Sequence, residues 1–242
     1  MESAGPRLRW VDAGLVRYAT AYRWQQVLHA RRVAGEIDDV LLLMEHPHVY
    51  TLGRRFRSSH LLADPAELAR LGIEVHEADR GGSITYHGPG QLVAYPVVDL
   101  RPPDGGPPDM IGYLRLLEAA IVEVAARFGV TASARRGLTG VWVGEEKVAS
   151  IGVNISRGVA KHGLALNVST DLSYFARMVP CGIDGCRLTS LERVLGASIA
   201  IDEVAVLLAG ALARRLGRTL VSAGLDDYDL APAPIPADAV GF

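Results

Sequence analysis

The sequence of 242 residues predicts an α+β fold with a mixed, largely antiparallel sheet and flanking helices. Strand-like runs come in groups with hairpin-length gaps and do not alternate strictly with helices. Several segments carry helix start signals followed by apolar residues at helical spacing. With 49% hydrophobic and 21% charged residues, the chain has enough apolar surface for one large domain.

The predicted strands are apolar or alternating runs bounded by turn residues. In the last of them, Leu164, Leu166 and Val168 share one face, and Asn167 lies on the other. Glycine-containing turns at 144–146 and 156–158 separate neighbouring runs. The predicted strands are Leu8–Val11, Val40–Glu45, Val49–Leu52, Leu92–Val98, Val141–Val143, Val148–Ile155 and Leu164–Val168.

Helices are predicted from caps and from apolar spacing. Apolar residues recur every three or four positions between Met110 and Phe128, and a further helix is expected near Arg17–Val33. The predicted N-terminal signals are a capping box at Asp64 with Pro65 in the first helical position, a capping box at Thr189, and Asp202 as the cap of a helix reaching Leu216.

Residues 1–229 are expected to form a single catalytic domain, followed by an extended Pro/Ala-rich tail at 230–242. The formal net charge of −2 gives no reason to expect nucleic acid as a partner. No apolar run approaches the roughly 18 residues of a membrane span, and the N-terminus lacks a signal-peptide core. We therefore expect a soluble, cytoplasmic protein.

Arginines cluster at 54, 55 and 57 and again at 135 and 136. A cluster of this kind is usually a solvated basic face. It is also what a docking patch for an acidic partner requires. The sequence leaves both interpretations open.

The segment Arg80–Gln91 (RGGSITYHGPGQ) is the most informative in the chain. Its four glycines let the backbone approach a ligand closely, so we expect a binding loop that buries little apolar surface. Tyr86 and His87 lie between the glycines and can orient a ligand. From the residues alone, His87 is equally a general base or a hydrogen-bonding wall residue.

Other reactive side chains have modest local support. Cys181 lies between a proline and a glycine on a turn, where a structural thiol is the more common interpretation. Lys147 follows a turn and is by default a surface lysine, although beside a thiol it would favour the thiolate. His46 and His48 are spaced like a metal pair without a third ligand, so a structural role is favoured. Cys186 has no motif around it.

Six segments in one order resemble the lipoyl(octanoyl) transferases, and the Ser83-Ile84 variation resembles the mycobacterial type. These segments extend over most of residues 41–191. They are Arg80–Gln91, the run 46–54 (HPHVYTLGR), Gly140–Val143 with Lys147, Ser150–Gly152, His162–Val168 and Pro180–Ile183.

The resemblance implies a fold similar to the catalytic domains of lipoate and biotin protein ligases, with an enclosed acyl tunnel. It implies that Cys181 and Lys147 are the catalytic pair, and His87 becomes a substrate-orienting residue. The substrate-binding residues that it implies are Arg80, Gly81, Gly82, Ser83, Ile84, Thr85, Tyr86, His87, Ser150, Ile151, Gly152, Gly163, Leu164 and Ala165.

The family's reaction moves an octanoyl or lipoyl group from the phosphopantetheine thiol of acyl carrier protein to a lysine of a lipoyl domain. The acceptors are the E2 subunits of 2-oxoacid dehydrogenases and the glycine cleavage H protein. The resemblance implies a thioester on Cys181, with Lys147 promoting the thiolate and later taking a proton from the acceptor amine. Backbone N–H groups near 150–152 or 163–165 would hold the oxyanion, and neither ATP nor a metal is expected.

Three alternatives remain. An ATP-dependent lipoate ligase on the same fold needs no nucleophilic cysteine, and an amidotransferase would move octanoyl between lipoyl domains. A non-catalytic acyl-binding module would have no use for both Cys181 and Lys147. The sequence does not determine the acyl length, the oligomeric state or the docking surfaces.

Overall fold

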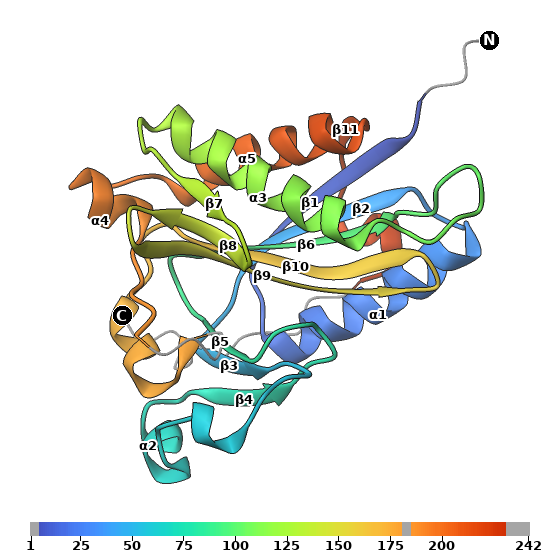
Figure 1. The fold of residues 1–242 in the computed structure, drawn as a ribbon. Coiled ribbons are helices and arrows are strands. Elements are labelled where there is room, and N and C mark those ends of the chain that lie inside the picture. The colour runs from blue at the N-terminus through green and yellow to red at the C-terminus, as the bar shows by residue number, and fades with distance from the viewer. Residues whose placement is uncertain (1–4, 181–184, 231–242) are drawn as a thin grey trace.

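The computed structural model describes residues 5–180 and 185–230, and its main element is an eight-stranded sheet (Figure 1). The strand order is β11-β1-β2-β6-β10-β9-β8-β7. β1 pairs in parallel with β2 and β11, and the other neighbours are antiparallel, which confirms the predicted mixed, largely antiparallel sheet. The strands are β1 (Arg7–Leu15), β2 (Asp39–Glu45), β6 (Gln91–Asp99), β7 (Ser133–Arg135), β8 (Leu138–Val143), β9 (Glu146–Ser156), β10 (Val159–Asn167) and β11 (Thr219–Ser222).

A second sheet of three strands lies below the first in Figure 1. Its strands are β3 (Val49–Leu52), β4 (Glu74–Glu77) and β5 (Ile84–His87), with β3 in the middle, parallel to β4 and antiparallel to β5. β5 lies inside the segment expected to be a loop. All four of its residues are buried, so the expectation that this segment buries little surface is wrong.

Helices cover both faces of the large sheet. α3 (Met110–Arg127) and α5 (Ile201–Leu216) lie side by side on one face, and α1 (Tyr18–Ala34) contacts β6 and β10 from the other (Figure 1). The short helices are α2 (Pro65–Arg70) and α4 (Leu191–Leu195), with 3₁₀ turns at Ser58–His60, Leu172–Arg177 and Leu225–Tyr228.

The helix starts agree with the sequence in part. Asp64 caps α2 and accepts a hydrogen bond from a backbone N–H at 2.8 Å, as predicted. Ser190, and not Thr189, caps α4 with its hydroxyl. Ala200 occupies the cap position of α5, so Asp202 lies in the first turn, where a carboxylate is favoured by the helix dipole.

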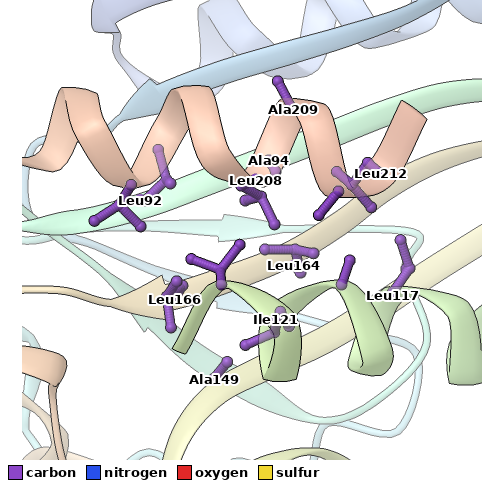
Figure 2. Packing of buried hydrophobic residues seen from close by; sticks show 14 of the residues in the cluster. Leu92, Ala94, Leu117, Ile121, Ala149, Leu164, Leu166, Leu208, Ala209 and Leu212 are labelled. Atoms are coloured by element: carbon purple, nitrogen blue, oxygen red, sulfur yellow. The ribbon is translucent and has the colours of Figure 1, made fainter. Parts of the chain in front are cut away.

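The main core lies between the large sheet and the α3–α5 layer (Figure 2). Leu117 and Ile121 of α3, Leu208 and Leu212 of α5 and Leu164 of β10 all belong to this core cluster, and each is at most 3% exposed. Each such side chain contributes roughly 1.5–3 kcal/mol by burial.

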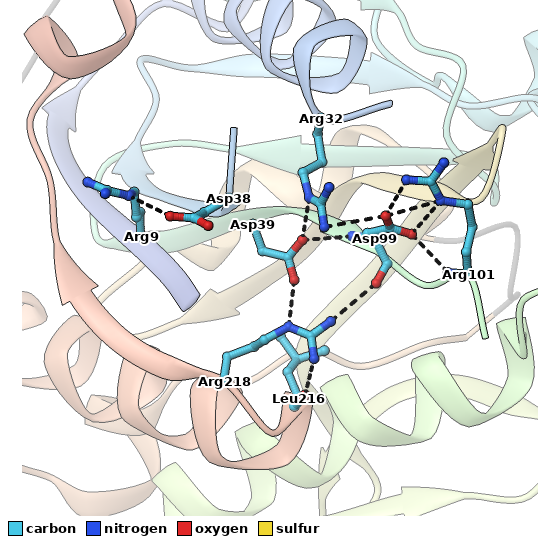
Figure 3. Close-up of polar contacts among 8 residues, drawn as sticks. All are labelled: Arg9, Arg32, Asp38, Asp39, Asp99, Arg101, Leu216 and Arg218. Carbon is cyan, nitrogen blue, oxygen red and sulfur yellow. Dashed lines mark hydrogen bonds and ion pairs between the residues drawn. The ribbon is translucent and has the colours of Figure 1, made fainter. Parts of the chain in front are cut away.

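A buried ion network ties α1 to the sheet (Figure 3). The Asp39 carboxylate is 1% exposed and accepts hydrogen bonds from Arg32 at 2.7 Å and from Arg218 at 2.8 Å. Arg32 also pairs with Asp99, whose backbone N–H reaches Asp39 at 2.9 Å. Because a buried charge without its partner is strongly destabilising, this network is a structural element of the fold.

Leu230, the first residue of the predicted tail, is 5% exposed and packs in the cluster between α1 and the sheet. The rest of that tail, 231–242, lies outside the described residues. Within 5–180 and 185–230, none of the helices has the length and apolar character needed to cross a membrane.

Candidate functional site

A cavity of about 520 Å³ is lined by residues of both sheets. This volume is within the range of small-molecule sites. Among the substrate-binding residues that the sequence predicts, all except Gly81 and Tyr86 line it. They come from the 80–87 segment, from β9 (Ser150, Ile151, Gly152) and from β10 (Gly163, Leu164, Ala165).

Gly81 and Tyr86 lie behind this wall. The N–H of Gly81 donates to the Val153 carbonyl at 2.9 Å and joins the segment to β9. The fully buried Tyr86 hydroxyl lies 2.7 Å from His48 Nδ1, and its ring stacks on Tyr174 at 5.1 Å. Both residues support the cavity wall from outside its surface.

Arg80 lies where three segments meet, namely the end of β3, its own 80–83 segment and β9. Its Nη2 donates to Thr51 O at 2.6 Å and to Thr51 Oγ1 at 2.8 Å, and its Nη1 donates to Gly81 O at 3.1 Å. A Cβ on Gly53 would lie 2.7 Å from Arg80 Nη1, and one on Gly152 would lie 3.2 Å from Arg80 Cδ and 2.9 Å from Gly81 O. A Cβ on Gly53 would also lie 2.6 Å from the Gly82 carbonyl oxygen. Glycine is therefore required where β3 ends and in β9 because both the backbone of the 80–83 segment and the arginine pass so closely.

His87 is buried in the cavity wall and stays neutral. Burial, reinforced by His46 and Arg80, holds the pKa of His87 well below its ordinary value. Its ring stacks on Tyr18 of α1 with a centroid distance of 6.3 Å. The Tyr18 hydroxyl is buried without a hydrogen-bond partner among the described residues, and burial raises its pKa. Tyr18 lines the cavity and was missed by the sequence interpretation.

The carboxylate of Asp79 lies beside the cavity, in contact with His162 and Lys161. His162 Nε2 lies 2.7 Å from Asp79 Oδ1, and Lys161 Nζ lies 2.6 Å from Asp79 Oδ2. The hydrogen bond from His162 and the neighbouring Lys161 hold the pKa of the Asp79 carboxyl well below its ordinary value. His162 lines the cavity beside Tyr95, and the only sequence signal for Asp79 was its place next to Arg80.

A β-bulge directs Lys147. Trp142 pairs with Lys147 and Val141 pairs with Ala149, so Val148 is the extra residue. Val141 and Ala149 pack into the core below α3, so Lys147 lies with Trp142 on the opposite side of the strands. Lys147 is 1% exposed, with Nζ 5.1 Å from the centroid of the Trp142 ring. The interpretation of Lys147 as a surface turn residue is wrong.

Lys147 is also fixed by its backbone and by Gly140. Its N–H donates to Arg187 O at 2.8 Å, and its carbonyl accepts from Thr189 N at 3.0 Å. A Cβ on Gly140 would lie 2.5 Å from Lys147 Cε. The buried carboxylate of Glu118 in α3 accepts the Gly140 N–H at 3.0 Å. Lys147 itself is not among the residues that line the cavity.

Cys181 lies in 181–184, outside the described residues. The chain on either side of that segment is described. Val179, two residues before Cys181, donates its N–H to the His60 carbonyl at 2.8 Å, and His60 lines the cavity. Arg187, six residues after Cys181, pairs with the backbone of Lys147.

Exposed cationic residues line the cavity on one side. Arg55 and Arg57 are exposed and line it together with His60, whose Nδ1 lies 2.6 Å from Ser83 Oγ. Arg54 instead borders a neighbouring hollow lined by Tyr22 and Asp79. The arginine cluster therefore provides positive charge beside the cavity.

The two histidines with metal-like spacing are engaged within the protein. His46 Nδ1 donates to Val16 O at 2.6 Å, and the Tyr95 hydroxyl donates to His46 Nε2 at 2.8 Å. Burial lowers the pKa of His46 to about 4. Across 5–180 and 185–230, no three His, Cys, Asp or Glu side chains are grouped as metal ligands.

The fold and the site define an α+β domain that encloses a ligand-sized cavity between two sheets, with a buried lysine in the strand that forms one wall. The family model of the lipoyl protein ligase A/B catalytic domain matches residues 17–213. The chain belongs to this family, as its sequence motifs predicted.

Two relatives and one solved structure illustrate the similarity. An octanoyltransferase of Gloeobacter violaceus is 46% identical over 208 residues, covering 86% of this chain and 89% of the relative. An octanoyltransferase of Solibacter usitatus is 50% identical over 191 residues, covering 79% and 84%. A putative lipoate protein ligase of T. acidophilum with bound lipoic acid has a TM-score of 0.69 and 16% identity, covering 93% of this chain and 91% of that one. The last confirms the predicted fold class.

Proposed function

We propose that this chain is an acyltransferase that moves an octanoyl group onto the lysine of lipoyl domains, the first step of protein lipoylation. The relatives named octanoyltransferase match most of its length at 46% and 50% identity. One observation carries the proposal: segments far apart in sequence, 80–87, 150–152 and 163–165, line one cavity of about 520 Å³.

We propose octanoyl-acyl carrier protein as the donor and Cys181 as the nucleophile. The thiolate of Cys181 attacks the donor thioester, so a new C–S bond forms and the C–S bond to the carrier breaks. The carrier leaves as a thiolate and takes a proton from the Lys147 ammonium, which leaves Lys147 as an amine for the second step. The acceptor amine then attacks this acyl-enzyme, a C–N bond forms, and the Cys181 thiolate is released. The first step exchanges one thioester for another and is close to balanced in free energy. The second step converts a thioester into an amide and is favourable, so we expect no need for ATP or a metal.

Lys147 is suited to the role of proposed partner of Cys181. As an ammonium it would stabilise the thiolate, and as an amine it would take the proton from the incoming lysine. Its burial against Trp142 and Gly140 keeps the side chain in one position. Backbone N–H groups near 150–152 or 163–165 remain the proposed oxyanion donors.

Mass spectrometry tests the covalent step. Mixing the protein with octanoyl-carrier protein, without ATP and with EDTA, should add one octanoyl group to Cys181. Cys186→Ser is the matched control and should keep the adduct, whereas Cys181→Ser should lose it. Octanoyl transfer without any adduct on Cys181 would falsify the covalent route. Transfer that required ATP would support a ligase, and binding without transfer would support an acyl-binding module.

We propose that the arginines at the cavity receive the acidic carrier protein and the phosphate of its arm. Arg55 and Arg57 are exposed there. Arg55→Glu with Arg57→Glu should weaken capture of octanoyl-carrier protein, most strongly at low salt. The control is Arg127→Glu, an exposed position on α3, which does not line the cavity. Equal turnover in all three proteins would refute the assignment.

The acceptors we propose are the lipoyl domains of 2-oxoacid dehydrogenase E2 subunits and the glycine cleavage H protein, and the proposed location is the cytoplasm. Incubating the acyl-enzyme with each purified acceptor and measuring the octanoyl mass on its lysine tests the first point. Cell fractionation tests the second.

A further inference from the structure

A chain of buried side chains runs from the cavity into the large sheet through His87, Gln91 and Asn167. His87 Nδ1 lies 2.7 Å from Gln91 Oε1, and Gln91 Nε2 lies 2.9 Å from Asn167 Oδ1. Asn167 Nδ2 lies 3.0 Å from the carbonyl oxygen of Thr189. The three side chains belong to residues that are 6%, 2% and 2% exposed.

The backbone at the far end fixes the direction of every hydrogen bond. The Thr189 carbonyl can only accept, so Asn167 turns its NH₂ group toward it and its oxygen toward Gln91. Gln91 must then donate, and the same NH₂ group also lies 3.2 Å from Tyr86 O, another acceptor. Only the oxygen of Gln91 is left for His87. Nδ1 of His87 therefore carries the ring proton.

The surroundings of His87 do not stabilise a second proton. The groups that face it are Tyr18 from α1, His46 at the end of β2, Arg80, and His162 from β10. Burial is the largest cause of the lowered pKa of His87, and none of these groups is an anion that would oppose it. Nε2 is thus unprotonated, and His87 lines the cavity.

We infer that Gln91 and Asn167 are positioning residues that fix the His87 tautomer, so that Nε2 accepts a hydrogen bond from an N–H group of the substrate. This inference rests on the proposed function. A fatty acyl chain offers no N–H, so the donor is either the amide beside the thioester in the carrier's arm or the amine of the acceptor lysine. In this role His87 recognises a nitrogen-bearing group of the donor or of the acceptor, and it does not recognise the acyl chain.

Nitrogen-15 NMR of histidine-labelled wild-type protein at neutral pH tests the tautomer directly. His87 should carry its proton on Nδ1. His29 is the internal reference with the opposite tautomer, since its Nε2 lies 3.2 Å from two backbone carbonyls, those of Ser156 and Val159. A His87 proton on Nε2, or a charged His87 ring, would overturn the inference without reference to activity.

Gln91→Glu tests the role of the tautomer. A carboxylate in contact with Nδ1 would raise the pKa of His87. In the resulting imidazolium Nε2 carries a proton, so it can no longer accept a hydrogen bond from a substrate N–H group. Activity should fall at least about tenfold below the new pKa and recover above it. Gln26→Glu is the control. It is the same change on α1 beside Lys161, outside the cavity, and should keep the wild-type pH profile.

Two half-reactions identify the N–H donor. One is acylation of the enzyme by octanoyl-pantetheine, compared with the octanoyl thioester of ethanethiol, which has no amide. The other is transfer from preformed acyl-enzyme to a lipoyl domain. A pH-dependent loss confined to octanoyl-pantetheine would identify the arm amide, and a loss confined to transfer would identify the amine. An unchanged Gln91→Glu profile in both steps would overturn the inference and leave the proposed function intact, whereas an inactive wild type would contradict the proposed function alone.

Discussion

Replacing Gly140 by alanine should impair the enzyme through Lys147. The new Cβ would lie 2.5 Å from Lys147 Cε, 3.1 Å from its Nζ and 2.7 Å from the Ala149 carbonyl oxygen. Carbon atoms in contact are about 3.5–4.0 Å apart, so Cε must withdraw by about 1 Å or more. Gly140 also has φ +133°, a backbone conformation that alanine disfavours.

The magnitude follows from these two effects. Misplacement of a catalytic group by about 1 Å can lower the rate by about 100-fold. Backbone strain at residue 140 should lower the free energy of unfolding by roughly 1–3 kcal/mol. The rate of octanoyl transfer to a lipoyl domain measures the first effect, and urea unfolding measures the second.

Gly144→Ala is the matched control for Gly140→Ala. Gly144 also has positive φ, +55°, but a Cβ added there would have no atom within 4 Å of it. This variant should lose about 1–2 kcal/mol of stability with little change in rate. A Gly140→Ala enzyme with full activity, or an equal loss of rate in both variants, would refute the role assigned to the Gly140–Lys147 contact.

Three further outcomes concern stability. Glu118→Ala leaves the Gly140 N–H without its acceptor and should lower the free energy of unfolding by about 1–3 kcal/mol, whereas Glu118→Gln should cost less; equal losses in urea unfolding would contradict this. Burial lowers the pKa of His46 to about 4, so as pH falls the unfolded chain takes up a proton on His46 before the folded protein does. The free energy of unfolding should therefore fall by up to about 3 kcal/mol between pH 6.5 and 4, and this part of the loss should be absent in His46→Gln. The depressed pKa of Asp79 contributes stability that is fully present above about pH 4 and is lost as pH falls toward the folded-state pKa, so Asp79→Asn should destabilise at pH 7 and its difference from wild type should shrink only below about pH 4.

The sequence predicted the large sheet well because its strands are long and apolar or alternating. β6 and β9 are found where the runs predicted them, whereas β10 begins at Val159, five residues before the predicted Leu164, and the short edge strands β7 and β11 were missed. The small sheet was largely missed. β5 lies among glycines and β4 is a short polar strand, so neither has a strong apolar pattern, and both form because β3 pairs with them.

The site was predicted through motif resemblance more than through periodicity. The burial of Lys147 depends on the bulge at Val148, and an alternation rule has no means of placing an extra residue. Tyr18 was missed because it is the first residue of an ordinary helix. Its proximity to His87 arises only when α1 packs across the sheet.

The passage of residues 80–83 between Gly53 and Gly152 has a consequence for how such motifs are compared. Glycines in separate segments reflect one packing constraint, the course of a single backbone segment together with the Arg80 side chain. They should therefore vary together among relatives, and counting them as independent matches overstates a similarity. In the laboratory the same dependence should appear as non-additivity: Gly53→Ala and Gly152→Ala both displace this segment, so the double variant should lose less stability than the sum of the two single variants.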